Sequence, residues 1–178
     1  MPFFSTIVHN VYNVNTNLRI DPFVWNLFFD GSRYNYGAGA GCVLIDPSGT
    51  KTMIACRLEF ECTNNVYEYE ALVQGIRKAI DLGEKTIECI GDSEIIVKQV
   101  RNQIHCPSPH LINYQRLIKG TTRSFLAFNI RSIPRSKNFD ADLLANTASR
   151  LISPEGLSLQ TFSIDLIYRP SIIDNVMN

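Results

Sequence analysis

The amino-acid sequence predicts an α/β domain built on a mixed five-stranded sheet, with three antiparallel strands first, parallel additions later, and helices flanking the sheet. Two observations lead to this prediction. The first part of the chain holds three short apolar runs separated by turn signals, which is typical of an antiparallel meander. Strand-like and helix-like segments then alternate, which indicates crossover connections between parallel strands.

The first three strands are expected at Trp25–Ser32, Ala40–Ile45 and Thr52–Phe60. The first run is apolar and aromatic and closes on a Gly-Ser turn signal, so Asp30 stands close to its end. An Asp-Pro-Ser-Gly turn, Asp46–Gly49, separates the second strand from the third. Strands joined by such short turns pair with their neighbours in the antiparallel sense.

From residue 64 the apolar spacing changes to three and four residues, which predicts an amphipathic helix over Asn64–Leu82 that ends at a glycine. The next helix, Glu94–Val100, follows a short β-branched strand and can be capped by Asp92 or Ser93. Asn138 can cap the last helix in the same way. The elements expected after the first helix lie at Thr86–Ile90, Glu94–Val100, Leu111–Ile118, Phe128–Ile133 and Asn138–Leu151.

Length and charge limit the domain organisation and the kind of partner. At 178 residues the chain fits one ordinary domain with extra length at its ends. We expect an N-terminal appendage or linker at residues 1–23, the domain at 24–152 and a C-terminal tail at 153–178. Because 17 basic side chains balance 17 acidic ones, a local basic patch, rather than overall charge, has to hold any nucleic acid.

The cellular setting is predicted from apolar runs and cysteines. No run approaches the roughly 18 apolar residues that a membrane span needs, and the first ten residues lack the pattern of a signal peptide. The five cysteines are odd in number and form no CxxC pair, which favours a reducing compartment. We therefore expect an intracellular protein, cytoplasmic or nuclear, that is neither secreted nor bound to a membrane. The sequence does not indicate its oligomeric state.

Three acidic residues are expected to converge. Asp30 ends the first strand, Asp92 ends the fourth, and Glu68 lies in the first turns of the long helix, at the flank of its buried face. Glu68 alone could equally serve the helix macrodipole. Glu70 aligns with the polar residues of the same helix, which places it on the solvent face. Carboxylates gathered in a small volume repel one another unless cations join them, and magnesium prefers oxygen ligands.

Five sequence blocks make this arrangement specific, and together they resemble type 1 ribonuclease H. The resemblance is greatest to the form that plant long-terminal-repeat retrotransposons carry beside their reverse transcriptase, and it covers about Trp25 to Leu151. The blocks, in chain order, are DGS (Asp30–Ser32), GAGAG (Gly37–Gly41), TNNVYEYEAL (Thr63–Leu72), GDSEIIVKQV (Gly91–Val100) and IPRSKNFDADLLA (Ile133–Ala145).

The resemblance implies a metal-dependent endonuclease that hydrolyses the RNA strand of RNA/DNA hybrids by a two-metal-ion mechanism. The catalytic and metal-binding residues would be Asp30, Glu68, Asp92 and Asp142. Asp30 would bridge two Mg²⁺ ions, Glu68 and Asp92 would hold the ion nearer the leaving group, and Asp142 would help to hold the ion that activates water. Mn²⁺ is a possible substitute.

The resemblance also implies contacts with the substrate. The Thr63-Asn64-Asn65 turn would read the minor groove and one phosphate, although the same residues suit an ordinary turn and helix cap. Arg135 and Lys137 could meet substrate phosphate or lie in a solvated loop. The full set of expected substrate-binding residues is Gly31, Ser32, Thr63, Asn64, Asn65, Ser93, Arg135, Lys137 and Asn138.

Two other functions remain open at this stage. The first is a catalytically weak or inactive module with the ribonuclease H fold, which binds nucleic acid or tethers a reverse transcriptase. The second is an exonuclease or integrase-like relative, although the Thr-Asn-Asn turn argues against it. The expected partners are an RNA/DNA hybrid and a reverse transcriptase domain in a larger polyprotein. The basic protruding segment of cellular relatives is missing, and PRSKN (Pro134–Asn138) replaces their glycine- and histidine-containing loop.

Overall fold

The computed structural model describes residues 12–14, 18–20, 23–35, 37–150 and 163–172. A six-stranded mixed sheet forms its centre, in the spatial order β7-β6-β3-β4-β5-β8. β3, β4 and β5 form the antiparallel meander, whereas β6 is parallel to β3, β7 to β6, and β8 to β5. The six strands are β3 (Trp25–Tyr34), β4 (Gly37–Ile45), β5 (Lys51–Leu58), β6 (Thr86–Gly91), β7 (Ala127–Ser132) and β8 (Ile164–Ile167).

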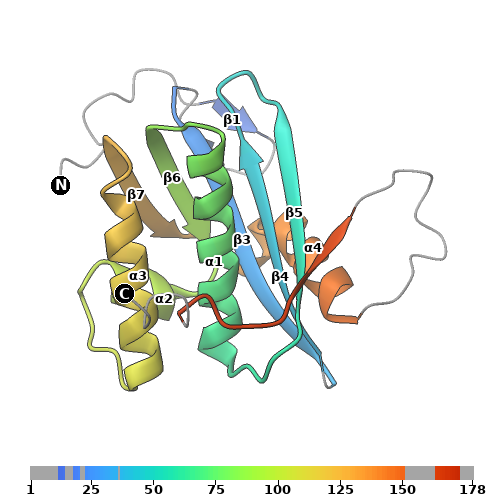
Figure 1. The fold of residues 1–178 in the computed structure, drawn as a ribbon. Helices are drawn as coiled ribbons and strands as arrows, with labels where there is room; N and C mark the ends of the chain where they lie inside the picture. Colours follow the sequence, from blue (N-terminus) through green and yellow to red (C-terminus); the bar gives the residue numbers. More distant parts are fainter. Residues whose placement is uncertain (1–11, 15–17, 21–22, 36, 151–162, 173–178) are drawn as a thin grey trace.

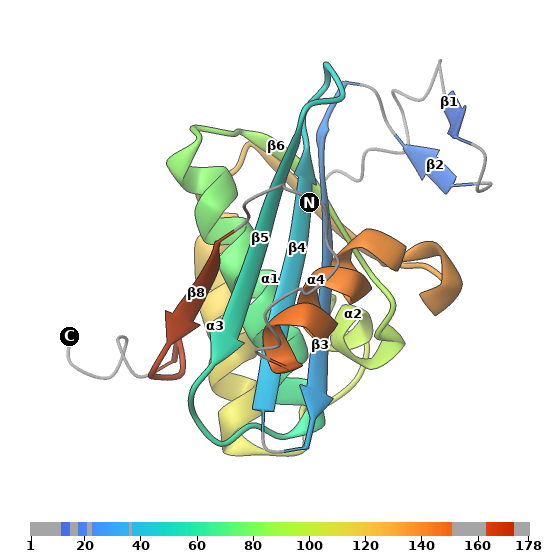
Figure 2. The ribbon, with the colours of Figure 1, turned by 90° about the vertical axis from the view of Figure 1, so that its right-hand side faces the viewer.

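The five expected strands are present, but the expectation of five strands in total is wrong because β8 adds a sixth. This short strand belongs to the predicted C-terminal tail, and it pairs with the outer edge of β5 (Figure 2). Two further strands, β1 (Tyr12–Val14) and β2 (Leu18–Ile20), form a separate antiparallel pair. The predicted division at residues 23 and 152 remains a prediction, since residues 21–22 and 151–162 lie outside the described part.

Four α-helices accompany the sheet in the described ranges, all close to their predicted positions. Ser93 caps α2, because its side chain accepts a hydrogen bond from the Ile96 N–H at 3.4 Å. A 3₁₀ turn, Arg135–Lys137, leads into the last helix. The helices are α1 (Asn64–Asp81), α2 (Glu94–Val100), α3 (Pro109–Thr122) and α4 (Phe139–Arg150). Leu151, the expected end of the last helix, lies outside the described residues.

The helices cover the two faces of the sheet, with α1 and α3 on one side and α4 on the other (Figures 1 and 2). Alternate residues of β3 show this division. Leu27 and Phe29 are fully buried in the core beneath α1, whereas Phe28 belongs to a second core with Ala141 and Leu144 of α4. The strand that carries Asp30 is therefore held from both faces.

Glycines of the GAGAG block let α4 lie directly on β4. A Cβ atom on Gly41 would stand 2.4 Å from the Ala141 carbonyl oxygen and 2.5 Å from the Ala145 nitrogen, both of which are backbone atoms of α4. A Cβ on Gly39 would stand 2.2 Å from the Ala145 oxygen. Any side chain here would push the helix away from the sheet. The position of Asp142, which lies on this helix, therefore depends on these two glycines.

We predict that Gly41→Ala destabilises the protein by about 1–3 kcal/mol, because the added methyl group meets helix backbone that cannot move locally. Urea denaturation of the full chain measures this change. Gly120→Ala is the matched control, since Gly120 lies exposed in α3 and its Cβ would meet no atom of the described chain within 4 Å. Better helix propensity should make that control more stable by about 0.5–1 kcal/mol. Equal stability of Gly41→Ala and wild type would contradict the close packing of α4.

Candidate active site

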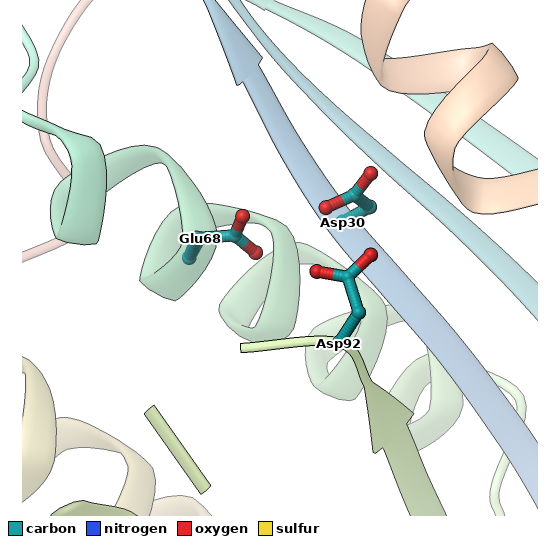
Figure 3. Close-up of side chains that lie close together, drawn as sticks. All are labelled: Asp30, Glu68 and Asp92. Atoms are coloured by element: carbon teal, nitrogen blue, oxygen red, sulfur yellow. The ribbon is translucent and has the colours of Figure 1, made fainter. Parts of the chain in front are cut away.

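Three acidic side chains meet at one end of the sheet. Asp30 lies on β3, Glu68 on α1, and Asp92 directly after β6, and one carboxylate oxygen of each lies within 4.8 Å of the others (Figure 3). Asp30 is buried, with 3 % of its surface exposed, and the other two are half-buried. The structure thus brings together three of the four acids that the sequence predicted.

The sheet register and a close helix contact produce this meeting. β3 and β6 are parallel neighbours with Phe28 opposite Ile90, so Asp30 and Asp92 each come two residues further along their chains. Gly31 lets α1 approach, because a Cβ there would stand 2.5 Å from the Tyr67 ring and 2.7 Å from the Glu68 nitrogen.

The Gly31 N–H also holds two of the acids. It donates to Asp30 Oδ1 at 3.0 Å and to Glu68 Oε2 at 3.2 Å. This single donor therefore joins the strand acid to the helix acid. Gly31 was predicted as a substrate contact, and the structure gives it these roles in packing and in orienting the carboxylates.

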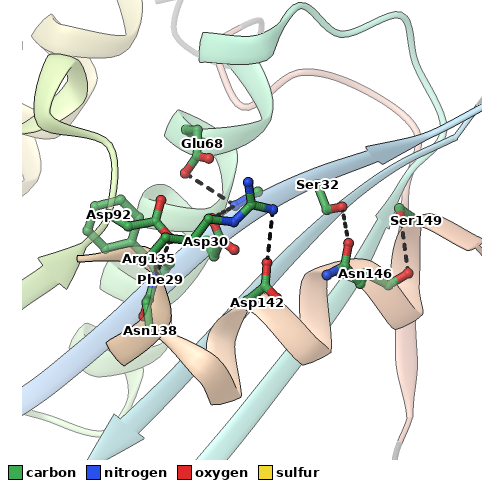
Figure 4. A network of polar contacts seen from close by, with 11 residues as sticks. Phe29, Asp30, Ser32, Glu68, Asp92, Arg135, Asn138, Asp142, Asn146 and Ser149 are labelled. Carbon is green, nitrogen blue, oxygen red and sulfur yellow. Dashed lines mark hydrogen bonds and ion pairs between the residues drawn. The ribbon is translucent and has the colours of Figure 1, made fainter. Parts of the chain in front are cut away.

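The fourth acid, Asp142, lies on α4 outside this group of three. Its Oδ1 is 3.5 Å from Nη2 of Arg135, and that ion pair links the helix to the 3₁₀ turn before it (Figure 4). The same oxygen is buried, and no described residue forms a hydrogen bond with it. Asp142 nevertheless acts on the cluster, because a side-chain hydrogen bond with Asp142 and then the Asp142 charge contribute to the raised pKa of Asp30.

Burial raises the pKa of each clustered acid, and the charges of its neighbours in the cluster raise the pKa of Asp30 and of Glu68 further. The pKa of Asp30 rises to about 9, through burial first and then the charges of Glu68 and Asp92. The pKa of Glu68 rises to about 8, again through burial and then the Asp92 charge, against the lowering effects of a hydrogen bond with Asp30 and of the Gly31 N–H. Burial also raises the pKa of Asp92, although the Asn138 amide and Arg135 oppose this. The three groups therefore need positive charge nearby before all can ionise.

This donor set fits a hard divalent cation. The ligands are all carboxylate oxygens, one buried and two half-buried, and they are held close together; a buried oxygen of Asp142, besides its ion pair with Arg135, accepts no hydrogen bond from the described residues. Such cations take oxygen ligands and lower the free energy of ionised carboxylates that repel one another. A cation would thus offset the repulsion that the raised pKa values report.

Asn138 supports the site from inside the protein. Only 1 % of its surface is exposed, and its side-chain Nδ2 donates to the Phe29 carbonyl at 2.9 Å and to Asp92 Oδ2 at 3.3 Å. It was predicted as a helix cap and substrate contact. It does precede α4, and its carbonyl accepts the Asp142 N–H at 3.1 Å, but its side chain faces the core and orients Asp92.

The other predicted substrate residues lie around the acids with different degrees of exposure. Thr63 is exposed at the start of α1, and the side chain of Arg135 is 79 % exposed. Asn65, Lys137 and Ser32 are half-buried, while the side chain of Asn64 lies outside the described part. Ser93 is used as the cap of α2.

The prediction missed Asn146, which binds one of these residues. Ser32 Oγ donates to Asn146 Oδ1 at 2.5 Å, and this bond joins β3 to α4 (Figure 4). Asn146 lies four residues after Asp142, and helix geometry places such residues on the same side of a helix. That spacing was the available signal for it.

The expectation that Glu70 faces solvent is wrong, because its side chain is fully buried. Its Oε1 accepts hydrogen bonds from the Tyr114 hydroxyl at 2.5 Å and the Ser171 N–H at 2.7 Å, and its Oε2 accepts one from Ser171 Oγ at 2.7 Å. The side of α1 that looks polar in sequence is covered by α3 and by residues 163–172. These partners lie 44 and 101 residues away, so the local pattern could not reveal them.

Comparison with known proteins assigns the fold. The model of the family described as reverse transcriptase-like matches residues 28–148, which is more than half of the chain. The chain belongs to the reverse transcriptase-like family. It is similar to ribonuclease HI of Halobacterium salinarum, which is 34 % identical over 123 residues, covering 68 % of this chain and 62 % of that protein. A bifunctional protein of Mycobacterium tuberculosis is 31 % identical over 120 residues, 66 % of this chain and 33 % of its own length.

Solved structures lead to the same assignment of the fold. The crystal structure of ribonuclease H1 from Halobacterium salinarum superposes with a TM-score of 0.68 at 29 % identity, covering 72 % of this chain and 98 % of that one. LC11-RNase H1 in complex with an RNA/DNA hybrid gives 0.66 at 28 % identity, covering 71 % and 97 %. The predicted resemblance to type 1 ribonuclease H is confirmed, whereas the plant retrotransposon form is untested. The chain spans less than two thirds of the length of the two protein relatives.

No helix in the described ranges of the chain combines the length and apolar character of a membrane span.

We predict that the metal-free protein loses stability as the pH rises. Asp30 and Glu68 bind protons more tightly when folded, because their pKa values of about 9 and about 8 exceed the ordinary values of 3.8 and 4.5. Their contribution to stability is therefore complete below the ordinary values and is lost as pH rises through the folded values. Thermal unfolding in EDTA should show a falling midpoint between about pH 5 and about pH 9.

Two comparisons control this pH experiment. Asp30→Asn removes the first of these groups and should flatten the pH dependence. Added Mg²⁺ should raise the unfolding midpoint more at high pH than at low pH, because binding requires ionised carboxylates. If the unfolding midpoint in EDTA depends on pH in the same way in wild type and in Asp30→Asn, the acids do not repel one another as proposed.

Proposed function

We propose that this chain is a metal-dependent endonuclease that hydrolyses the RNA strand of RNA/DNA hybrids. The observation that carries the proposal is the group formed by the buried Asp30 and the half-buried Glu68 and Asp92, whose oxygens gather within 4.8 Å in a fold similar to ribonuclease H1. A similar structure whose title includes an RNA/DNA hybrid supports the choice of substrate. The family match supports the same class of chemistry.

The metal-binding residues in this proposal are Asp30, Glu68, Asp92 and Asp142. They would hold Mg²⁺, as two ions, with Mn²⁺ as a possible substitute. Bound divalent ions supply an activated water and stabilise charge on the attacking and leaving oxygens of a phosphodiester. The open hydrogen-bonding capacity of the buried Asp142 Oδ1 supports its place in this set.

Neighbouring groups of the chain hold these acids in position for that chemistry. The Gly31 N–H fixes one oxygen each of Asp30 and Glu68, and the Asn138 amide fixes Asp92 Oδ2. Because such hydrogen bonds restrict the orientation of the carboxylates, they reduce the reorganisation that ligand binding would require.

The substrate side of the proposal rests on exposed residues next to the acids. The guanidinium of Arg135 lies 3.5 Å from Asp142 and is largely exposed, so it can contact a substrate phosphate near the reacting bond. Thr63, Asn64 and Asn65 begin the helix that carries Glu68 and would read the wide minor groove and the 2′-hydroxyls of the RNA strand. Lys137 and Ser32 would add contacts to the sugar–phosphate backbone.

The wider context is part of the same proposal. The order of the five motif blocks supports a retrotransposon origin and a reverse transcriptase domain as a neighbour in a larger polyprotein. The even balance of 17 basic and 17 acidic residues favours the second candidate, a weak or inactive module that binds nucleic acid or tethers a reverse transcriptase. Cleavage separates these two functions.

We predict that Asp92→Asn abolishes Mg²⁺-dependent cleavage of a labelled RNA/DNA hybrid while the thermal unfolding profile stays cooperative. The change keeps the shape of the side chain but removes one charge from the ligand group. Single-stranded RNA and duplex DNA serve as substrates that should remain uncut. Product lengths show whether the cuts are internal, as an endonuclease requires.

The matched control is Asp140→Asn on α4. Asp140 is half-exposed and pairs with Lys51 at 3.4 Å on the surface, so this variant should cleave like wild type. If the wild-type chain cuts no hybrid with Mg²⁺ or Mn²⁺, even in large protein excess, the enzyme proposal fails and the binding module remains.

A further inference from the structure

Residues 163–172, here called the strap, dock on the domain at two separate places. At one end, β8 pairs in parallel with β5, and the Glu59 N–H donates to the Ile167 carbonyl at 2.8 Å. At the other end, Ser171 and Ile172 are buried, with 3 % and 8 % of their surfaces exposed. Tyr168 between them is 67 % exposed. The strap thus crosses from the edge of the sheet over α1 to α3 (Figure 1).

Ser171 binds α1 over two helical turns. Two of the three hydrogen bonds that Glu70 accepts come from Ser171, one from its N–H and one from its hydroxyl. The same hydroxyl oxygen accepts from Gln74 Nε2 at 3.3 Å and from Arg77 Nη1 at 3.2 Å. If the strap were not docked, Glu70 would keep a single donor, the Tyr114 hydroxyl, in a fully buried position, which is unfavourable for a carboxylate. Docking of the strap and the placement of α1 are therefore coupled.

Glu70 and Glu68 fix α1 from nearly opposite sides. With 3.6 residues per turn, side chains two residues apart project about 200° from each other. Glu68 contacts the Gly31 N–H of β3, and Glu70 contacts the strap and Tyr114. The start of α1 adds little to this restraint within the described structure, because Thr63 makes no side-chain cap and the first turn holds no acid. The two glutamates therefore add polar restraints to the rotation that the buried apolar residues of α1, among them Tyr69 and Leu72, already give the first half of the helix.

We propose that Ser171 is a positioning residue for the active site: by holding Glu70, the strap refines the rotation that core packing gives α1 and thereby places Glu68 among the metal-binding carboxylates. This inference rests on the proposed function for its meaning, but its geometry involves only the chain itself. If the strap served stability alone, it would cover the edge of β5, and the positions of the metal-binding carboxylates would not depend on Ser171.

The test compares Ser171→Ala with Ser163→Ala in the full chain. The first change removes the hydroxyl from Glu70, Gln74 and Arg77, and the second removes an exposed hydroxyl from the same strap. Calorimetric titration with Mg²⁺ alone should give a Kd for Mg²⁺ that is about three- to tenfold higher in Ser171→Ala than in wild type. This loss of affinity is no larger than the smallest losses typical when a group that hydrogen-bonds a metal ligand is removed. Ser163→Ala should match wild type.

A second readout reports the position of Glu68 without metal. The Gly31 amide donates to both Asp30 and Glu68, so its NMR resonance should shift in Ser171→Ala and stay unchanged in Ser163→Ala. In hybrid cleavage, the Mg²⁺ concentration for half-maximal rate should rise while KM for the hybrid remains the same. If the wild-type chain binds Mg²⁺ but cuts no hybrid, the proposed function fails while the Kd and the Gly31 resonance still decide the role of Ser171.

Two results would overturn the inference. The first is a Ser171→Ala variant that unfolds at lower temperature but keeps the wild-type Kd and Gly31 resonance, since the strap would then only add stability. The second concerns Tyr114→Phe, which decides the matter if Ser171→Ala does not fold. Tyr114→Phe removes the third hydrogen-bond donor of Glu70 and leaves the bonds from the strap intact. The Kd for Mg²⁺ and the Gly31 amide resonance should therefore remain near their wild-type values. A large change there would show that α3, rather than the strap, positions α1.

Discussion

Repulsion among carboxylates held within 4.8 Å of one another is the constraint on which the site depends. Local groups such as the Gly31 N–H and Arg135 reduce it only in part, because the largest influences on Asp30 and Glu68 are burial and the neighbouring negative charges. The surrounding structure must therefore impose the arrangement. Parallel pairing of β3 with β6 brings two acids together, and packing of α1 adds the third. Folding energy from the rest of the domain thus holds the acids in a high-energy arrangement that a divalent cation would relax.

Three glycines are as important for the geometry of the site as the acids themselves. Gly31 admits the backbone of α1 to one face of β3, and Gly39 and Gly41 admit the backbone of α4 to the opposite face of β4. Helices normally stand off a sheet by the length of the side chains between them. Removing those side chains at three places lets both helices deliver short carboxylates to the same end of the sheet. The glycine-rich block is thus part of the machinery that places the acids.

Local sequence patterns predicted what local physics determines, and missed what distant segments decide. Apolar period and turn residues located the five main strands and the four helices, and strand ends located Asp30 and Asp92. β8 was missed because it has four residues, one of them charged, and gains its order from the edge of β5. The inward side chain of Asn138 was also missed, since its cap-like position says nothing of the Phe29 carbonyl 109 residues away. Hydrogen-bond and strand partners so far apart in the sequence cannot be recognised from a local stretch of residues.

Glu68 and Glu70 show why burial alone does not identify a functional carboxylate. The two residues share a residue type and a helix and lie two positions apart, and Glu70 is the more deeply buried. Glu70 is nevertheless fully supplied with donors, since Tyr114 and Ser171 give it three hydrogen bonds from neutral groups. Glu68 receives one backbone donor and faces two further acids. A buried acid with satisfied hydrogen bonds is a structural element, whereas acids with few donors that face like charges either stay protonated or ionise beside a cation. The shortage of donors, rather than the depth of burial, therefore separates the active-site acid from its neighbour.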